Sequence, residues 1–226
     1  MNNTFDDDPV VAATSEFVRD QLHGEQTGHD WWHAQRVMHL ATMIAQEERA
    51  DLRIVRLAAL LHDVKDFKFV GNFDEGPKLA RSWLTSNGVD ERVITAVEAI
   101  VRGVSFKGAN VTEVVLSLEG RCVRDADRLD AMGAIGIART FAYGGHVGRP
   151  IHDPDCDPVL HDSLDTYLNS TGTTINHFHE KLLLLKDRLT TSTGRRLGDI
   201  RHDRLLRFLA DFDEEWQQVG DLASVR

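Results

Sequence analysis

The fold and the chemistry of this chain are decided by residues 57–66, which read LAALLHDVKD. Five apolar residues run without interruption up to His62 and Asp63, so this pair ends a helix that packs into the core. A charged carboxylate in such surroundings is costly unless a partner compensates it. A divalent metal ion is one such partner, because imidazole and carboxylate together suit first-row metals. A hydrogen-bonded His–Asp pair that caps the helix is the alternative.

Outside this stretch, apolar residues recur at the three- and four-residue spacing of amphipathic helices. Val37, Leu40 and Ile44 form one such stripe, and Leu205 and Leu209 belong to another late in the chain. The one credible strand pattern, at 111–118, continues into a longer helical pattern, so we expect an all-α fold. Helices are predicted at 10–22, 30–48, 51–64, 75–87, 90–102, 112–130, 131–143, 174–189 and 196–218.

The length of 226 residues suits one domain that buries its own core. An apolar fraction of 42% with 27% charged residues is the composition of a folded protein. We therefore predict a single domain over 1–226, with a core at about 10–145, a proline-marked loop at 144–160 and a C-terminal helical extension at about 160–218.

The net charge of −10 argues against a nucleic-acid polymer as a partner, because a basic excess supplies most of that affinity. The acidic start predicts no signal peptide, and the longest aliphatic block, at 182–185, is too short to span a bilayer. We expect a soluble cytoplasmic protein that does not contact membranes. The apolar C-terminal helix serves either the core or a homodimer interface, which leaves the oligomeric state open.

Two further positions point to the same metal site. His33 shares a helix face with Val37, so it points inward, either as a ligand or as a hydrogen-bonded core histidine. Asp127 lies among small and apolar neighbours in DADRLDAMGAIGIAR, where Asp125 and Asp130 compete with it for the role. Together with the His62–Asp63 pair, these residues form a set of two nitrogens and two carboxylates that leaves coordination positions open.

The order His33, His62-Asp63, Asp127 resembles the signature of the HD-domain metal-dependent phosphohydrolases. Four sequence blocks carry the resemblance through most of the chain: HDWWHAQRV at 29–37, HDVKDFKF at 62–69, DADRLDAMGAIGIARTFAYGG at 125–145 and INHFHEKLLLLKDRL at 175–189. They are similar to a bacterial subfamily of nucleoside triphosphate pyrophosphohydrolases. The resemblance implies an HD-domain helical bundle, a divalent ion at the four motif residues and hydrolysis of a phosphate ester or anhydride.

The expected cofactor is one divalent metal ion per chain, with Mn, Mg, Ni, Co, Fe or Zn as candidates. HD proteins with two metals generally recruit extra histidines between the HD pair and the last aspartate, and this chain has none between His62 and Asp127. Without imidazole ligands a tight second site for a late first-row metal is hard to build.

Several further residues are candidates for acid–base chemistry or for holding a nucleotide. Asp66 lies one turn beyond His62 and is the predicted general acid or base, with a solvated helix end as the alternative; Lys65 beside it is predicted to assist. Arg36 either orients a ligand or forms a structural ion pair with Asp127 or Asp130. The predicted substrate-binding residues are basic, and for each a solvated or structural role is the alternative: His29, Arg36, Lys107, Arg128, Arg139 and His146, with His177 and Lys181 completing the positive lining.

Three functions are compatible with this pattern. The first is hydrolysis of a (deoxy)nucleoside triphosphate to a monophosphate and diphosphate. The second is another HD-type reaction, such as a nucleoside monophosphatase. The third is a non-catalytic, nucleotide-sensing helical domain with a structural metal.

Overall fold

The computed structural model describes residues 8–24, 28–64, 74–106, 108–163, 166 and 169–223, and these residues contain no strand. The prediction of an all-α fold is confirmed. The N-terminal helices are α1 (Pro9–Gln21), α2 (Trp31–Glu48), α3 (Leu52–Leu61), α5 (Glu75–Ser86), α6 (Glu91–Gly103) and α7 (Leu118–Asp130). They are followed by α8 (Gly133–His146), α10 (Thr174–Glu180), the 3₁₀ helix η1 (Leu182–Arg188) and α11 (Ser192–Ala223).

Aspartate side chains set where several of these helices begin. Asp8, Asp30, Asp51 and Asp90 each accept a hydrogen bond from a backbone N–H in the first turn of α1, α2, α3 and α6. Such caps satisfy donors that have no partner inside the helix, and each contributes about 1 kcal/mol. The predicted starts therefore lie within about one residue of the observed ones.

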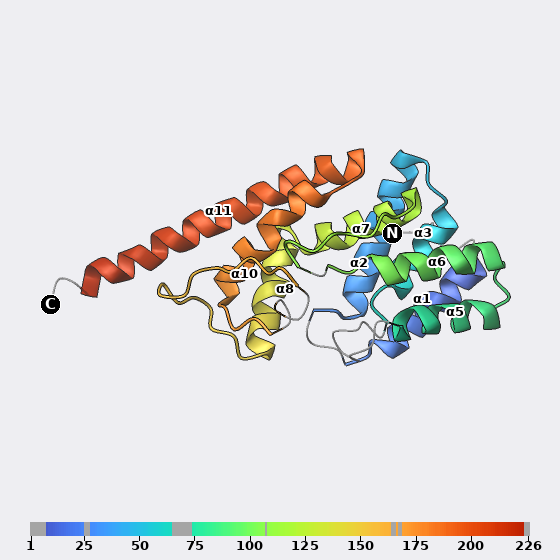
Figure 1. Ribbon diagram of the computed structural model, residues 1–226, viewed down its shortest axis with the longest axis horizontal. Helices are drawn as coiled ribbons and strands as arrows, with labels where there is room; N and C mark the ends of the chain where they lie inside the picture. Colours follow the sequence, from blue (N-terminus) through green and yellow to red (C-terminus); the bar gives the residue numbers. More distant parts are fainter. Residues whose placement is uncertain are drawn as a thin grey trace.

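Helix α2 lies at the centre of the N-terminal bundle, packed against both α3 and α7 (Figure 1). Its Ile44 is fully buried, as are Leu57 and Leu60 of α3 and Leu129 of α7. This three-helix packing brings the ends of α3 and α7 to the same part of α2, where His33 lies.

Three predicted helices are shorter than expected. The one predicted at 51–64 ends at Leu61, so His62 and Asp63 lie in the turn that follows α3. Residues 112–117 are not helical, because α7 begins only at its cap, Ser117, while Arg124 holds the carbonyl of Val114 in an extended segment. The helix predicted at 174–189 breaks at Lys181, whose φ of −141° is incompatible with an α-helix, and continues as η1.

The C-terminal part packs through aromatic side chains. Phe178 of α10 stacks on Phe208 of α11, with ring centroids 5.4 Å apart, and Phe141 of α8 meets both rings. Beyond this contact α11 extends past the rest of the fold (Figure 1). Its 32 residues span about 48 Å. None of the described helices combines the length and the apolar character that a bilayer span requires.

Candidate metal centre and adjoining pocket

His33, His62 and Asp127 bring one potential ligand atom each to a common point, and these atoms all lie within 4.8 Å of one another. Asp63 joins them: its Oδ2 is 3.1 Å from His33 Nε2, and its Oδ1 is 3.4 Å from His62 Nε2. Asp127 Oδ1 lies 3.5 Å and 3.7 Å from the same two nitrogens. The four predicted ligands thus converge from α2, the end of α3 and α7.

Hydrogen bonds behind the two imidazoles fix which nitrogen faces this point. His33 Nδ1 donates to Asp130 Oδ2 at 2.7 Å, and His62 Nδ1 donates to the carbonyl of Ala59, also at 2.7 Å. Both partners are acceptors only, so each Nδ1 carries the proton and each Nε2 presents a lone pair. This arrangement is typical of histidines that ligate a metal.

The atoms that face the centre lack hydrogen-bond partners. His33 Nε2, His62 Nε2 and Asp63 Oδ2 are buried, and none of them forms a hydrogen bond of good geometry among the described residues, although they lie close to one another. Unsatisfied buried polar atoms are costly and rare in folded proteins. A divalent cation would satisfy all three at once, so the donor set fits a metal ion.

The charges of the site favour a cation as well. Burial opposes protonation of His62, but the carboxylates of Asp63 and Asp127 outweigh burial and raise its pKa to about 9. Burial also raises the carboxyl pKa values, yet the neighbouring His62 holds the pKa of Asp63 and that of Asp127 well below the usual range. Two anionic carboxylates thus attract a positive charge to the centre, and a bound metal ion supplies it in place of a proton.

The three carboxylates near the end of α7 have separate partners. Asp125 accepts hydrogen bonds from the backbone and side chains of Thr190 and Thr191, just before α11. Asp130 pairs with Arg36 and Arg139 behind His33. Asp127 alone of the three contributes to the metal cluster.

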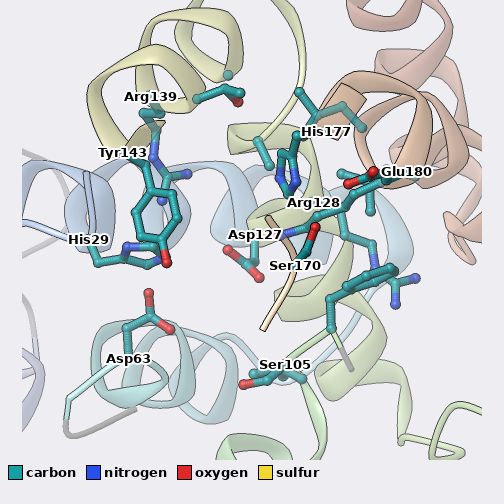
Figure 2. Close-up of a pocket in the computed structure, with 18 of the residues that line it drawn as sticks. His29, Asp63, Ser105, Asp127, Arg128, Arg139, Tyr143, Ser170, His177 and Glu180 are labelled. Atoms are coloured by element: carbon teal, nitrogen blue, oxygen red, sulfur yellow. The ribbon is translucent and has the colours of Figure 1, made fainter. Parts of the chain in front are cut away.

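A pocket of about 150 Å³ opens directly from the metal centre. Figure 2 shows the carboxylate of Asp63 towards one end of it, His177 and Glu180 towards the other, and the carboxylate of Asp127 between them. Ser105 lines the wall between α6 and α7. The pocket therefore joins the N-terminal bundle to the C-terminal part of the fold.

The predicted substrate-binding residues fall into three groups. His29, Arg128 and Arg139 line the pocket, as do His177 and Lys181. Arg36 instead forms the ion pair with Asp130, and His146 is exposed at the end of α8; neither belongs to the pocket lining. The predicted catalytic residues Lys65 and Asp66 and the predicted phosphate contact Lys107 lie outside the described residues.

Several lining residues escaped the sequence analysis, among them Tyr143, Arg149, Ser170 and Glu180. Tyr143 follows Arg139 by one helical turn, and its hydroxyl points towards His29 and Asp63 in Figure 2. Arg149 lies in the proline-marked loop, and Ser170 and Glu180 come from residues around α10. Tyr143 is part of the FAYGG block and could have been found by its spacing from Arg139.

Comparison with known proteins identifies the family. Residues 31–132 match the model of the HD domain. YpgQ of Bacillus subtilis (strain 168) is 36% identical over 200 residues, which cover 88% of this chain and 90% of YpgQ.

Solved structures agree with this match. A crystal structure from Lactobacillus plantarum superposes with a TM-score of 0.84 at 37% identity, covering 93% of this chain and 98% of that one. A HD-superfamily hydrolase from Bacillus thuringiensis gives 0.71 at 37% identity, with 92% and 96% covered. The crystal structure of Bacillus subtilis YpgQ in complex with ADP gives 0.72 at 32% identity, with 91% and 97% covered. The chain belongs to the HD-domain family of metal-dependent phosphohydrolases.

Proposed function

We propose that this protein hydrolyses a (deoxy)nucleoside triphosphate to the monophosphate and diphosphate, with one divalent metal ion held by His33, His62, Asp63 and Asp127. The observation that carries this proposal is the continuity of the metal cluster with a pocket whose lining is rich in basic side chains. A phosphate chain placed there reaches the ion at one end and cations along the wall.

The electrostatics of the pocket support an anionic substrate. The chain has a net charge of −10, yet basic side chains gather in the lining of this cavity beside Asp63, Asp127 and Glu180: Arg128, Arg139, Arg149, His177 and Lys181. A locally positive cleft in an acidic protein attracts phosphates and excludes most other metabolites. The similar protein YpgQ has been crystallised with ADP, which favours a nucleotide as the ligand class.

A divalent ion, when bound, lowers the pKa of water and neutralises charge on phosphoryl oxygens. The chain's own residues orient the substrate around it. Arg139 is held by Asp130 and by the carbonyl of Gly28, so its guanidinium is fixed at the pocket wall. Arg128 lines the opposite part of the same wall, next in sequence to the ligand Asp127. Acid–base assistance from Asp66 and Lys65 is part of the proposal.

The decisive experiment is turnover of a panel of nucleoside tri-, di- and monophosphates with added Mn²⁺, followed by identification of the products. We expect monophosphate and diphosphate from triphosphates. Release of inorganic phosphate from monophosphates would instead support the monophosphatase alternative. Nucleotide binding without turnover of any member would indicate a sensing domain.

The metal stoichiometry has its own test. Elemental analysis of dialysed, nucleotide-free protein is expected to give about one ion per chain, because four protein ligands suffice for one site. Two tightly held ions per chain would contradict this and would reopen a two-metal phosphodiesterase reaction. With one ion per chain, cyclic dinucleotides are expected to be poor substrates. Several expectations stay predictions. They are the metal identity, the cytoplasmic location, the single-domain boundaries, the lack of nucleic-acid polymer or membrane partners and the homodimer.

A further inference from the structure

A second, smaller cavity of about 40 Å³ lies beside the nucleotide pocket. Ser105 and Arg128 line both cavities, so the two are immediate neighbours. Arg124 and Arg188 line only the second one. One water molecule needs roughly 10–15 Å³ of such free volume, so the cavity has room for a few waters or one tetrahedral oxyanion.

The charges around this second cavity do not balance within the described residues. Arg124, Arg128 and Arg188 all form their ion pairs with the same carboxylate, that of Glu113. Arg124 and Arg128 are only 5% and 4% exposed. The four groups together therefore carry a formal charge of +2, and two of the cations are buried. The carboxylate of Asp125 also acts on the charge of Arg124, but its oxygens accept from Thr190 and Thr191 and form no ion pair with the three arginines.

The arginines also have unused hydrogen-bonding capacity. The Nε atoms of Arg124 and Arg128 are buried and have no partner among the described residues. Burial and the neighbouring Arg128 lower the pKa of Arg124, as expected of a guanidinium that lacks enough negative charge around it. Buried cations without full compensation are destabilising unless an anion joins them.

We propose that this cavity is an oxyanion site that binds a phosphoryl group through Arg124, Arg128 and Arg188. The guanidinium group matches the geometry of phosphate oxygens, and three of them exceed what Glu113 can neutralise. The anion is either free phosphate or diphosphate, or the distal phosphates of a polyphosphate chain that enters past Ser105. The second source rests on the proposed function, whereas the site itself does not.

Helix α7 links this oxyanion site to the metal centre. Arg124 and Arg128 are one turn apart on α7, and Asp127 lies between them in the sequence and faces the metal cluster. One rigid helix thus presents a carboxylate to the cation site and two guanidinium groups to the anion site. A polyphosphate chain held at both sites would be fixed along its length.

A purely structural role is the competing explanation. Arg188 donates to the carbonyls of Gly108 and Ala109, and Arg124 donates to that of Val114, so the cluster also holds residues 108–114 in place. Such a clamp predicts a loss of stability on mutation but no anion binding. Direct binding measurements separate the two roles.

The test is calorimetric titration of metal-free protein with sodium diphosphate and, separately, with sodium phosphate. Without metal, binding reports on basic side chains rather than on a metal ion, and Arg124→Gln assigns it to the second cavity because Arg124 lines that cavity and not the first. We expect about one diphosphate per chain for the wild type, and a loss of affinity of about tenfold or more in Arg124→Gln. Arg196→Gln is the matched control, because Arg196 is an exposed arginine paired with Glu47 on another face.

The outcomes are distinct. No diphosphate or phosphate binding to the metal-free wild type overturns the site, as does wild-type affinity in a folded Arg124→Gln variant. If Arg124→Gln does not fold, Arg188→Gln decides by the same criterion.

With metal added, competitive inhibition by diphosphate and a raised KM for triphosphate in Arg124→Gln identify the substrate's distal phosphates as the source. Non-competitive inhibition with an unchanged KM identifies a free anion. A failure here leaves the product analysis of the proposed function untouched.

Discussion

The two ends of the pocket at the metal centre are built differently. At the metal end His33 lies on α2, His62 and Asp63 directly follow α3, and the three are 0%, 3% and 7% exposed. At the far end His177 comes from the short helix α10, and Arg149 and Ser170 lie outside the described helices. The metal ligands are held by a core that forms without the substrate, whereas the far wall depends on how the C-terminal part packs. We infer that the first end sets the chemistry and the second sets the choice of substrate.

The largest effect is expected from substituting the metal ligands themselves. His62→Ala and Asp63→Ala should abolish metal binding, because each leaves an incomplete donor set around a buried charge. Turnover should fall by more than the roughly 10–100-fold that loss of an outer partner costs. Metal content by elemental analysis and turnover are measured together. His179→Ala, on the exposed face of α10, is the control. Wild-type turnover of His62→Ala or Asp63→Ala at limiting metal would place the metal site elsewhere.

A second comparison separates two carboxylates on the same helix. Asp130→Asn removes the negative charge behind His33 and replaces one acceptor oxygen with an NH2 donor, so it should weaken metal affinity by roughly 10–100-fold. Asp125→Asn should leave metal affinity unchanged and lower the free energy of unfolding by about 1–3 kcal/mol, since it disrupts the bonds from Thr190 and Thr191 before α11. Metal titration and thermal melting distinguish them, and equal losses of metal affinity would contradict the assignment.

Substitutions at the far end of the pocket should weaken substrate binding and leave metal binding unchanged. Lys181→Met removes a cation from the pocket and should raise KM for the triphosphate by about tenfold, at unchanged metal content. Lys186→Met is the matched control, because Lys186 pairs with Asp199 outside the pocket. A loss of bound metal in Lys181→Met would show that the two ends are not independent.

The smallest expected effect is a difference in thiol reactivity between the two cysteines, one in the N-terminal bundle and one in the C-terminal part. Cys122 lies on α7 with no exposed surface, and burial, together with nearby acidic groups such as Glu48, raises the pKa of its thiol to about 12. Cys156 is half-buried in the loop that precedes α10. At pH 8 a thiol reagent should modify one cysteine per native chain rapidly, and Cys156→Ser should remove that reaction. Equal reaction rates at both thiols would contradict the rigidity assigned to the metal end.

The sequence was sufficient for the elements whose signals are local. Apolar spacing predicted α1, α2, α5 and α6 closely, and the HD pair after LAALL identified the end of α3. The sequence could not rank Asp125, Asp127 and Asp130, because their partners come from distant segments: Thr190 and Thr191 for the first, Arg36 and Arg139 for the last.

The far wall was harder to predict for the same reason. Tyr143 and Glu180 reach the pocket through the packing of α8 and α10, which no local pattern reports. The break at Lys181 was missed because LLLLKDR has good helical propensity, and tertiary packing overrides such propensity. The roles of Lys65, Asp66 and Lys107 stay predictions.

The order of the residues along the chain has a consequence for biosynthesis. All four metal ligands and Asp130 precede α8, whereas His177, Glu180 and Lys181 come later. A ribosome adds about 5–20 residues per second, and N-terminal segments emerge first. The nascent chain therefore carries every metal ligand before it carries the far wall of its pocket. The emergence of the metal ligands and the emergence of the residues at the far end of the pocket are thus separated in time.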